Sequence, residues 1–280
     1  NKINSFFLQD NLIKNINYRD LIGYYYYISD YIPYAIIDNV IKMPNNYYRI
    51  YLKDIKNTKY LNYVDLTYEE LLSLYNKLLI RKERSEILKE RNIKKIVHFT
   101  KVENLESIFE NGILSVNRLN DSSIAYSPSD LFRLDDKLNM ISTSISFPNY
   151  KMFYSKRMEN PDIDWAVITI DPNLIIHKLD SEFYKTNAAS GIYSFDYSPT
   201  SNNNLLDMFY DEGRDPNIPK SYPTDPQAEI LINNRIPNTY FNSVETRKNI
   251  SKVKSLTRTA GIDYNPNSHL FSYRSDYKRW

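Results

Sequence analysis

The sequence has no cysteine, only three histidines and only five glycines among its 280 residues. The absence of cysteine excludes disulfides, thiolate nucleophiles and cysteine-ligated zinc, and it suits a reducing cytoplasm. Three scattered histidines do not supply a zinc site. No apolar stretch approaches the roughly 20 residues that span a bilayer, and the N-terminus lacks the pattern of a signal peptide. We therefore expect a cytoplasmic protein without a metal ion or a membrane segment.

The common catalytic motifs are missing as well. The sequence contains no GxxxxGK[ST] phosphate loop, no GxGxxG dinucleotide motif, no HExxH metalloprotease motif and no GxSxG hydrolase motif. The candidates that remain are one histidine near an expected helix start, a few arginines, and acidic residues on expected strands.

The composition itself is that of a globular protein, with 42% hydrophobic and 25% charged residues. The 26 tyrosines are unusual, and an AT-rich genome would produce this bias by itself. Although the net charge is only +2, residues 238–280 are basic. This tail is either a phosphate-facing surface or a solvated helix face. Its basic residues are Arg247, Lys248, Lys252, Lys254, Arg258, Arg274, Lys278 and Arg279.

The first third of the chain carries one clear helix signal. Residues 1–66 are rich in tyrosine and show no regular period, but Thr67 and Glu70 have the spacing of a capping box. Leucines at roughly helical spacing follow, so we expect a helix that runs to about Glu90. We place a domain boundary near residue 94. Residues 1–93 would form a mostly helical accessory region of unknown role, and residues 94–280 a second, larger domain.

Strand and helix signals alternate after this boundary, which predicts an α+β fold. Strands are expected at 96–99, 140–146, 165–170 and 228–232, and a helix at 149–158. Thr100 and Glu103 resemble a second capping box, and Gly112 follows the helix that would begin there, at the position of a left-handed C-cap. Residues 193–225 would be a long loop that is either functional or disordered.

Two charged residues and one histidine are the candidates for a site. His98 would end its strand beside a helix N-terminus, a position that favours anions such as phosphates. Glu229 is the only charge in the apolar strand AEILI, so it is either functional or faces water from an edge strand. Arg133 is either functional or paired on the surface with a neighbouring aspartate, Asp130, Asp135 or Asp136.

Four segments, taken in order, resemble the DarT family. They are HFTKVENLESIFENGILS (98–115), an arginine followed by ISTSISFPNYKMFY (133–154), TNAAS (186–190) and QAEILI (227–232). DarT proteins are bacterial toxins of the ADP-ribosyltransferase superfamily that use NAD to ADP-ribosylate a base in DNA. The resemblance covers about residues 94–240. It implies a split β-sheet core with flanking helices and NAD bound in the cleft.

The resemblance also assigns roles to residues. His98, Thr100 and Asn104 would contact NAD, and Arg133 would bind its phosphates, with Arg118 as a competitor. Glu229 would be the catalytic glutamate, with Arg133 as the second essential residue. Such a carboxylate stabilises positive charge at the ribose C1 and accepts the proton of the attacking base.

Further residues would hold the acceptor. Gln227, two residues before the glutamate, could read a base edge with its paired donor and acceptor. The segment FPNYKMFYSKRM is aromatic and basic, as single-stranded nucleic-acid sites are, and Phe153 within it is expected to be structural. The loop 193–225 could close over the acceptor. The residues of this segment predicted to contact the acceptor are Tyr150, Tyr154, Lys156 and Arg157.

The expected function is therefore NAD-dependent mono-ADP-ribosylation of guanine or thymine in DNA, single-stranded rather than duplex. The resemblance implies a toxin of a toxin–antitoxin or phage-defence system, and a macrodomain antitoxin as its partner. The sequence leaves open an RNA or protein acceptor, and an inactive module that binds NAD or nucleic acid.

Overall fold

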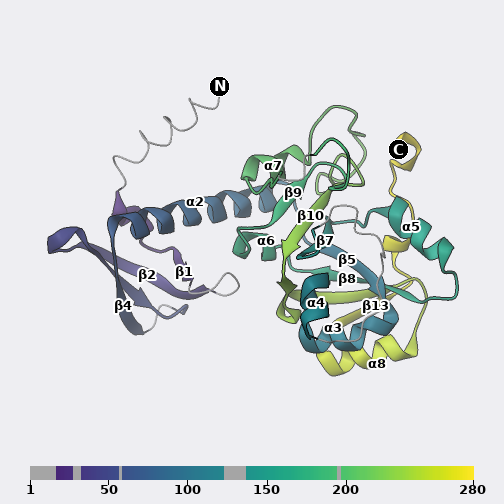
Figure 1. Ribbon diagram of the computed structural model, residues 1–280, viewed down its shortest axis with the longest axis horizontal. Coiled ribbons are helices and arrows are strands. Elements are labelled where there is room, and N and C mark those ends of the chain that lie inside the picture. The colour runs from purple at the N-terminus through teal and green to yellow at the C-terminus, as the bar shows by residue number, and fades with distance from the viewer. Residues whose placement is uncertain (1–16, 28–32, 57–58, 123–136, 194–196) are drawn as a thin grey trace. The chain divides into compact units, whose positions relative to one another are not determined.

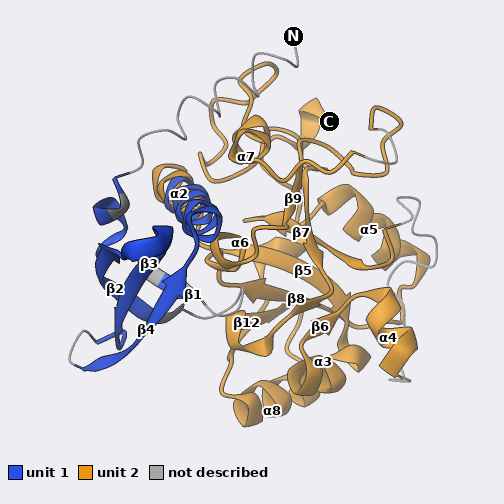
Figure 2. Ribbon diagram, turned by 60° about the vertical axis from the view of Figure 1, so that its left-hand side comes forward, with its two compact units in different colours: residues 1–83 blue, residues 84–280 orange. Residues whose placement is uncertain are grey.

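The computed structural model describes residues 17–27, 33–56, 59–122, 137–193 and 197–280. The chain divides into two compact units, 1–83 and 84–280 (Figure 2). The division falls inside helix α2 (Tyr68–Glu90), whereas the sequence places the boundary just after this helix.

The first unit contains a four-stranded antiparallel sheet in the order β1-β2-β3-β4. Its strands are β1 (Tyr25–Tyr27), β2 (Pro33–Lys42), β3 (Tyr48–Lys53) and β4 (Tyr60–Leu66), with the short 3-10 turns η2 (Tyr18–Leu21) and η3 (Pro44–Asn46). The prediction of a mostly helical accessory region is therefore wrong. Tyrosine and β-branched residues favour strands, and register shifts in all three ladders break the alternation that would have revealed them.

Helix α2 begins where the sequence predicts. The Thr67 backbone N–H donates to Glu70 Oε2 at 2.8 Å, and the Glu70 N–H donates to Thr67 Oγ1 at 3.3 Å. This reciprocal pair satisfies two of the N–H groups that a helix start leaves without partners. Leu71 and Leu78 of the helix are buried in one core with Ile50 and other sheet residues.

The second unit is built on a seven-stranded mixed sheet in the order β13-β12-β8-β5-β7-β10-β9 (Figure 1). The β12–β13 pair is parallel and the other pairs are antiparallel. The strands are β5 (Ile96–Lys101), β7 (Met140–Ile145), β8 (Trp165–Ile170), β9 (Glu182–Tyr184), β10 (Glu229–Asn233), β12 (Phe241–Thr246) and β13 (Asp263–Pro266). The predicted strands at 140–146, 165–170 and 228–232 are confirmed to within one residue at either end, as is the α+β class.

This sheet splits between β5 and β7. The two strands pair over two positions, Ile96 with Ile145 and Val97 with Ser144, and pairing then stops. By contrast, β5 pairs with β8 along its whole length. The predicted split sheet is therefore present, and the split opens beside His98.

Helices flank the sheet. They are α3 (Leu105–Asn111), α4 (Val116–Ser122), α5 (Tyr150–Glu159), α6 (Leu174–His177), α7 (Asn202–Asp207) and α8 (Ser251–Ala260), with the 3-10 turns η4 (Val102–Asn104), η5 (Asn238–Tyr240), η6 (His269–Phe271) and η7 (Tyr277–Arg279) and the short pair β6 (Ile113–Leu114) and β11 (Arg235–Ile236). Helices α3 and α8 lie side by side (Figures 1 and 2). The predicted helix at 149–158 is confirmed as α5, whose N-cap Asn149 accepts from the Met152 N–H.

The segment predicted as a long loop, 193–225, contains α7 and a buried apolar anchor in its described residues. Leu205, Met208 and Phe209 are at most 2% exposed, so this segment packs as part of the fold. Among the residues described, each helix is too short or too polar to cross a membrane.

Candidate active site

His98 lies in the middle of β5, so the prediction that it ends its strand is wrong. The strand continues because Thr100 and Lys101 pair with Ala166 and Trp165 of β8. The predicted capping box does not form either. Thr100 instead accepts a hydrogen bond from Asn104 Nδ2 at 3.1 Å, and α3 begins later, after the turn η4.

The His98 side chain contacts β7 where the backbone pairing between β5 and β7 stops. Its Nδ1 lies 2.9 Å from the backbone oxygen of Ser142 on β7. A carbonyl oxygen can only accept, so Nδ1 carries the proton in this hydrogen bond. In the neutral ring, Nε2 is then the nitrogen with the lone pair, and the ring orientation is fixed by the backbone.

Glu229 is the first residue of β10, which lies between β7 and β9 in the sheet. The side chain is 6% exposed, so the alternative of an edge strand facing water is wrong. Ser142 Oγ donates to its Oε1 and the Ala188 N–H donates to its Oε2, both at 2.8 Å. Two hydrogen bonds to a charged group offset much of the cost of burying it, and they fix the orientation of the carboxylate.

These contacts join the four segments that the sequence singled out. His98, Ser142, Ala188 and Glu229 come from four separate parts of the chain and form one hydrogen-bonded chain through Ser142. Ser142 thus holds two predicted site residues at once, the histidine through its carbonyl and the glutamate through its hydroxyl. This is the geometric centre of the candidate site.

Sequence reasoning missed the roles of Ser142 and Ala188. The signal for Ser142 was present in MISTSIS, where the small hydroxyl residues Ser142, Thr143 and Ser144 follow one another within an otherwise apolar strand. Ser142 pairs with Leu231, and alternation therefore places it on the same face of the sheet as Glu229. No sequence period could reveal Ala188, because its contribution is a backbone N–H in the turn that follows β9.

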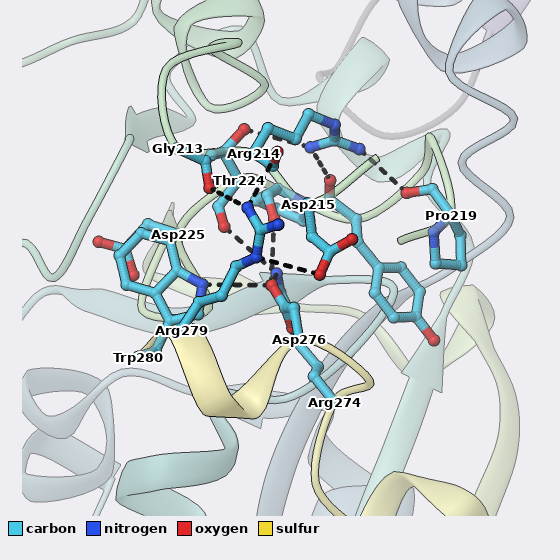
Figure 3. A network of polar contacts seen from close by, with 12 residues as sticks. Gly213, Arg214, Asp215, Pro219, Thr224, Asp225, Arg274, Asp276, Arg279 and Trp280 are labelled. Atoms are coloured by element: carbon cyan, nitrogen blue, oxygen red, sulfur yellow. Dashed lines mark hydrogen bonds and ion pairs between the residues drawn. The ribbon is translucent and has the colours of Figure 1, made fainter. Parts of the chain in front are cut away.

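Gln227 is half-buried in the turn before β10, and its N–H donates to Asp225 Oδ1 at 2.7 Å. The C-terminal segment holds the chain just upstream, as Figure 3 shows. Arg274 donates to the carbonyl oxygens of Pro223 at 3.0 Å and Thr224 at 3.2 Å, and it forms a buried ion pair with Asp276. The backbone that precedes Glu229 is therefore held in place by residues near the C-terminal end of the sequence.

Helix α5 packs on the face of the sheet that carries Ser142 and Glu229. There Phe153 stacks on Phe99, with ring centroids 4.6 Å apart. Phe153 is 1% exposed, which confirms its structural role. Tyr150 is also buried, and burial is the main reason that its pKa is raised. Tyr154 is 42% exposed, so of the two predicted acceptor tyrosines it is the accessible one.

The two basic residues of α5 differ in how they are engaged. Lys156 lies 3.8 Å from Glu159 in a weak surface ion pair. Arg157 is half-buried, donates to the Phe271 carbonyl oxygen at 3.0 Å and lies over the Phe153 ring. Burial lowers the pKa of Arg157. In the structure Arg157 therefore attaches the C-terminal segment to α5. The sequence predicts instead that this side chain contacts the acceptor.

The predicted phosphate-binding Arg133 lies outside the described residues. Its competitor Arg118 is exposed on α4, where its N–H donates to Ser115 Oγ. In the described part of the chain, no group of three His, Asp or Glu side chains is placed to hold a metal ion.

Comparison with known proteins decides the family. The family model described as ssDNA thymidine ADP-ribosyltransferase, DarT, matches residues 97–269, well over half of the chain. The chain belongs to this family. The resemblance seen in the sequence is thereby confirmed, as is the expectation of an NAD-dependent ADP-ribosyltransferase enzyme. The matched range includes His98, Ser142, Ala188 and Glu229, the four residues joined by hydrogen bonds in the candidate site.

Solved DarT structures are distant in sequence. The chain is 16% identical to Thermosipho africanus DarTG in complex with ADP-ribose, with a TM-score of 0.44, covering 64% of this chain and 51% of that one. It is 11% identical to Thermus sp. 2.9 DarT in complex with NAD+, with a TM-score of 0.41 and coverages of 64% and 98%. Against the same Thermus protein in complex with ADP-ribosylated ssDNA, the identity is 10%, the TM-score 0.48 and the coverages 65% and 97%. A search of curated proteins finds no match.

Proposed function

We propose that this protein transfers ADP-ribose from NAD to thymidine in single-stranded DNA. The observation that carries the proposal is the connection of His98, Ser142, Glu229 and Ala188 within a chain of the DarT family. The family description names the acceptor, and the site supplies a fixed, buried carboxylate for the chemistry. Thymine is therefore preferred to guanine, the other base that the sequence left open.

Glu229 is the catalytic residue of this proposal. When the bond between the ribose C1 and nicotinamide breaks, nicotinamide leaves with the electron pair, and positive charge develops on C1 and the ring oxygen. A carboxylate held in place before the reaction stabilises this charge without reorganisation. A nitrogen of the base then bonds to C1 and loses its proton, which the carboxylate of Glu229 accepts. The donors Ser142 and Ala188 orient the carboxylate for both steps.

NAD is the co-substrate, and the residues present fit it. His98, whose ring is oriented by its hydrogen bond to the Ser142 carbonyl oxygen, is a residue that would contact NAD. Thr100 and Asn104 lie next in the chain and are joined to each other by a hydrogen bond. Arg133 is the residue that would bind the phosphates, since a guanidinium matches phosphate oxygens in a paired geometry, with Arg118 as the competitor.

On the acceptor side, Gln227 precedes Glu229 by two residues, and its backbone N–H is held by Asp225 Oδ1. Its side-chain amide would form hydrogen bonds with the edge of the base. Tyr154 offers an exposed ring for stacking, and Lys156 a cation for a phosphate. Tyr150 and Arg157 belong to the same helix and support these residues, since Tyr150 is buried and the Arg157 guanidinium lies 5.9 Å from the centroid of the Tyr154 ring.

The test is to incubate the protein with NAD and, separately, with single-stranded DNA, duplex DNA, RNA and total cell protein. Mass spectrometry should find one added ADP-ribose on single-stranded DNA that contains thymidine. Label on guanine, or on RNA or protein alone, would contradict the proposed acceptor while keeping the enzyme class. Absence of label with every acceptor, while NAD still binds, would support the inactive module instead.

We further propose that the enzyme acts in the cytoplasm as a toxin, in a toxin–antitoxin or phage-defence system. A host of an active toxin of this kind needs a partner that removes ADP-ribose, and a macrodomain antitoxin has this chemistry. Expression in a bacterial host should stop growth, and co-expression of an ADP-ribose-removing macrodomain should restore it. Growth unaffected by active enzyme would contradict the toxin role.

A further inference from the structure

A row of exposed tyrosines connects helix α5 to the C-terminal segment. The Tyr154 and Tyr273 rings lie 5.7 Å apart between centroids, and the Tyr273 and Tyr277 rings stack at 5.3 Å with planes 28° apart. The three residues are 42%, 51% and 45% exposed. Folding does not bury these rings, although large aromatic side chains usually lie in the core or at interfaces. We call Tyr154, Tyr273 and Tyr277 the tyrosine ladder.

The ladder is attached to both strands that carry the site. Helix α5 follows β7, the strand of Ser142, after a short connection. On the other side, Arg274 is the neighbour of Tyr273 and binds the carbonyl oxygens of Pro223 and Thr224, which lead into Glu229 (Figure 3). The Tyr150 ring supports the ladder from within the core, edge-on to Tyr273 at 5.9 Å. These contacts connect the ladder to the segments of the chain that carry Ser142 and Glu229.

The surroundings of the ladder are basic. Helix α5 and residues 272–280 together contain six Lys and Arg side chains and two acids. Lys151 and Lys278 are exposed, and within the described ranges neither forms an ion pair. The two acids are already engaged, Asp276 with Arg274 in a buried pair and Glu159 with Lys156. Arg279 is paired as well, with Asp215 at 3.2 Å. The exposed cations beside the ladder that these acids leave unpaired include Lys151 and Lys278, and they are complementary to a phosphate backbone.

We infer that the tyrosine ladder binds the single strand on one side of the acceptor thymidine, with its bases against the rings and its phosphates near Lys151 and Lys278. This inference rests on the proposed function and adds a binding surface to it. Exposed aromatic rings with flanking cations are the usual way to bind single strands independently of sequence. Tyr273 and Tyr277 lie beyond the residues that match the family model, 97–269.

The test is the affinity for a fluorescent, thymidine-containing single-stranded oligonucleotide, measured by anisotropy without NAD and at one fixed salt concentration. Tyr277→Ala and Tyr154→Ala should each raise Kd about tenfold, the loss expected for one stacked base. Tyr277→Phe, which keeps the ring, should restore the affinity. The matched control is Tyr47→Ala, since Tyr47 is 47% exposed and lies in the first unit; its Kd should equal that of the wild type.

A second measurement avoids substitutions that disturb folding. Single-stranded DNA carrying 5-iodouracil is photocrosslinked to the wild-type protein, and the linked peptides are mapped by mass spectrometry. Links to Tyr154, Tyr273 or Tyr277 support the ladder, and links confined to other regions overturn it. If wild type modifies single-stranded DNA but Tyr277→Ala and Tyr154→Ala bind it equally well, the ladder is wrong and the proposed function stands. If wild type neither binds nor modifies single-stranded DNA, both are wrong.

Discussion

At the scale of single residues, the site depends on Ser142, which sequence reasoning did not select. Glu229 and His98 could be found from the sequence because each is chemically conspicuous, a lone charge in an apolar strand and one of three histidines. Ser142 is one of many serines, and its role depends on facing a glutamate 87 positions away. The predicted Arg133 has no described position, so its role stays a prediction.

Replacing Ser142 by alanine should lower kcat roughly 10- to 100-fold, since a hydrogen bond to a charged group contributes about 1.5 to 3 kcal/mol. The KM for NAD should change little, because the substitution affects the orientation of Glu229. The matched control is Ser144→Ala, which removes a buried hydroxyl from the same face of the same strand. Equal kcat values for the two variants would exclude a positioning role for Ser142.

At the scale of elements, helices and strands were predicted correctly where a single local feature, a capping box or an apolar run, determines them. The capping box at Thr67 and the apolar strands β7, β8 and β10 were predicted correctly. The strands of the first unit were not, because bulges disrupt their alternation. The second capping box failed because pairing with β8 extends β5 through Thr100, and this pairing is invisible in the local sequence.

Gly112 ends α3 with a φ of 78° and a ψ of 177°, a conformation outside the left-handed helical region that the sequence predicts. A Cβ at this position would lie 2.4 Å from the Ile236 backbone oxygen. Gly112→Ala should therefore lower the free energy of unfolding by about 2 kcal/mol or more, measured by urea denaturation. Gly191→Ala is the control, since its Cβ would meet nothing within 4 Å and its stability should match that of the wild type.

The capping box should also make α2 sensitive to acid. Hydrogen bonds from the backbone and hydroxyl of Thr67 lower the pKa of Glu70 below the ordinary value of 4.5. Because the folded pKa is the lower one, this stabilisation is present above pH 4.5 and is lost as the pH falls through the folded pKa. The difference in melting temperature between wild type and Glu70→Ala should shrink from pH 6 to pH 3. A difference that stays constant with pH would show that the Glu70 charge does not stabilise the helix.

At the scale of the whole molecule, helix α2 belongs to both units, and Arg84 is the point where the second unit begins. Arg84 is 0% exposed, and its guanidinium donates five hydrogen bonds to acceptors in the second unit. They reach Ile175 O at 2.6 Å, Thr200 O at 2.8 Å, Asn202 Oδ1 and Lys178 O at 3.0 Å, and Leu179 O at 3.2 Å. This role could not be predicted for Arg84, because the charged sequence RKERSEILKE fits either a solvated helix face or a connector into the next unit.

Arg84→Met should destabilise the second unit by roughly 3 kcal/mol, since it leaves several buried carbonyl oxygens without a donor. The Lys82→Met variant, two residues away and exposed, should stay within about 0.5 kcal/mol of the wild type. Chemical denaturation followed by the fluorescence of Trp165, a core residue of the second unit, would measure both. Equal stabilities would show that the Arg84 hydrogen bonds are replaced by water.

Under the proposed function, Glu229 catalyses the transfer of ADP-ribose to thymidine in single-stranded DNA. The most direct test is the intact mass of two oligonucleotides, identical except that one has its thymidines replaced by cytidines, after incubation with NAD and either wild type or Glu229→Gln. We expect one added ADP-ribose on the thymidine oligonucleotide with wild type, and none with the variant or with the cytidine oligonucleotide. The same label with Glu229→Gln, or on the oligonucleotide without thymidine, would contradict the proposed function.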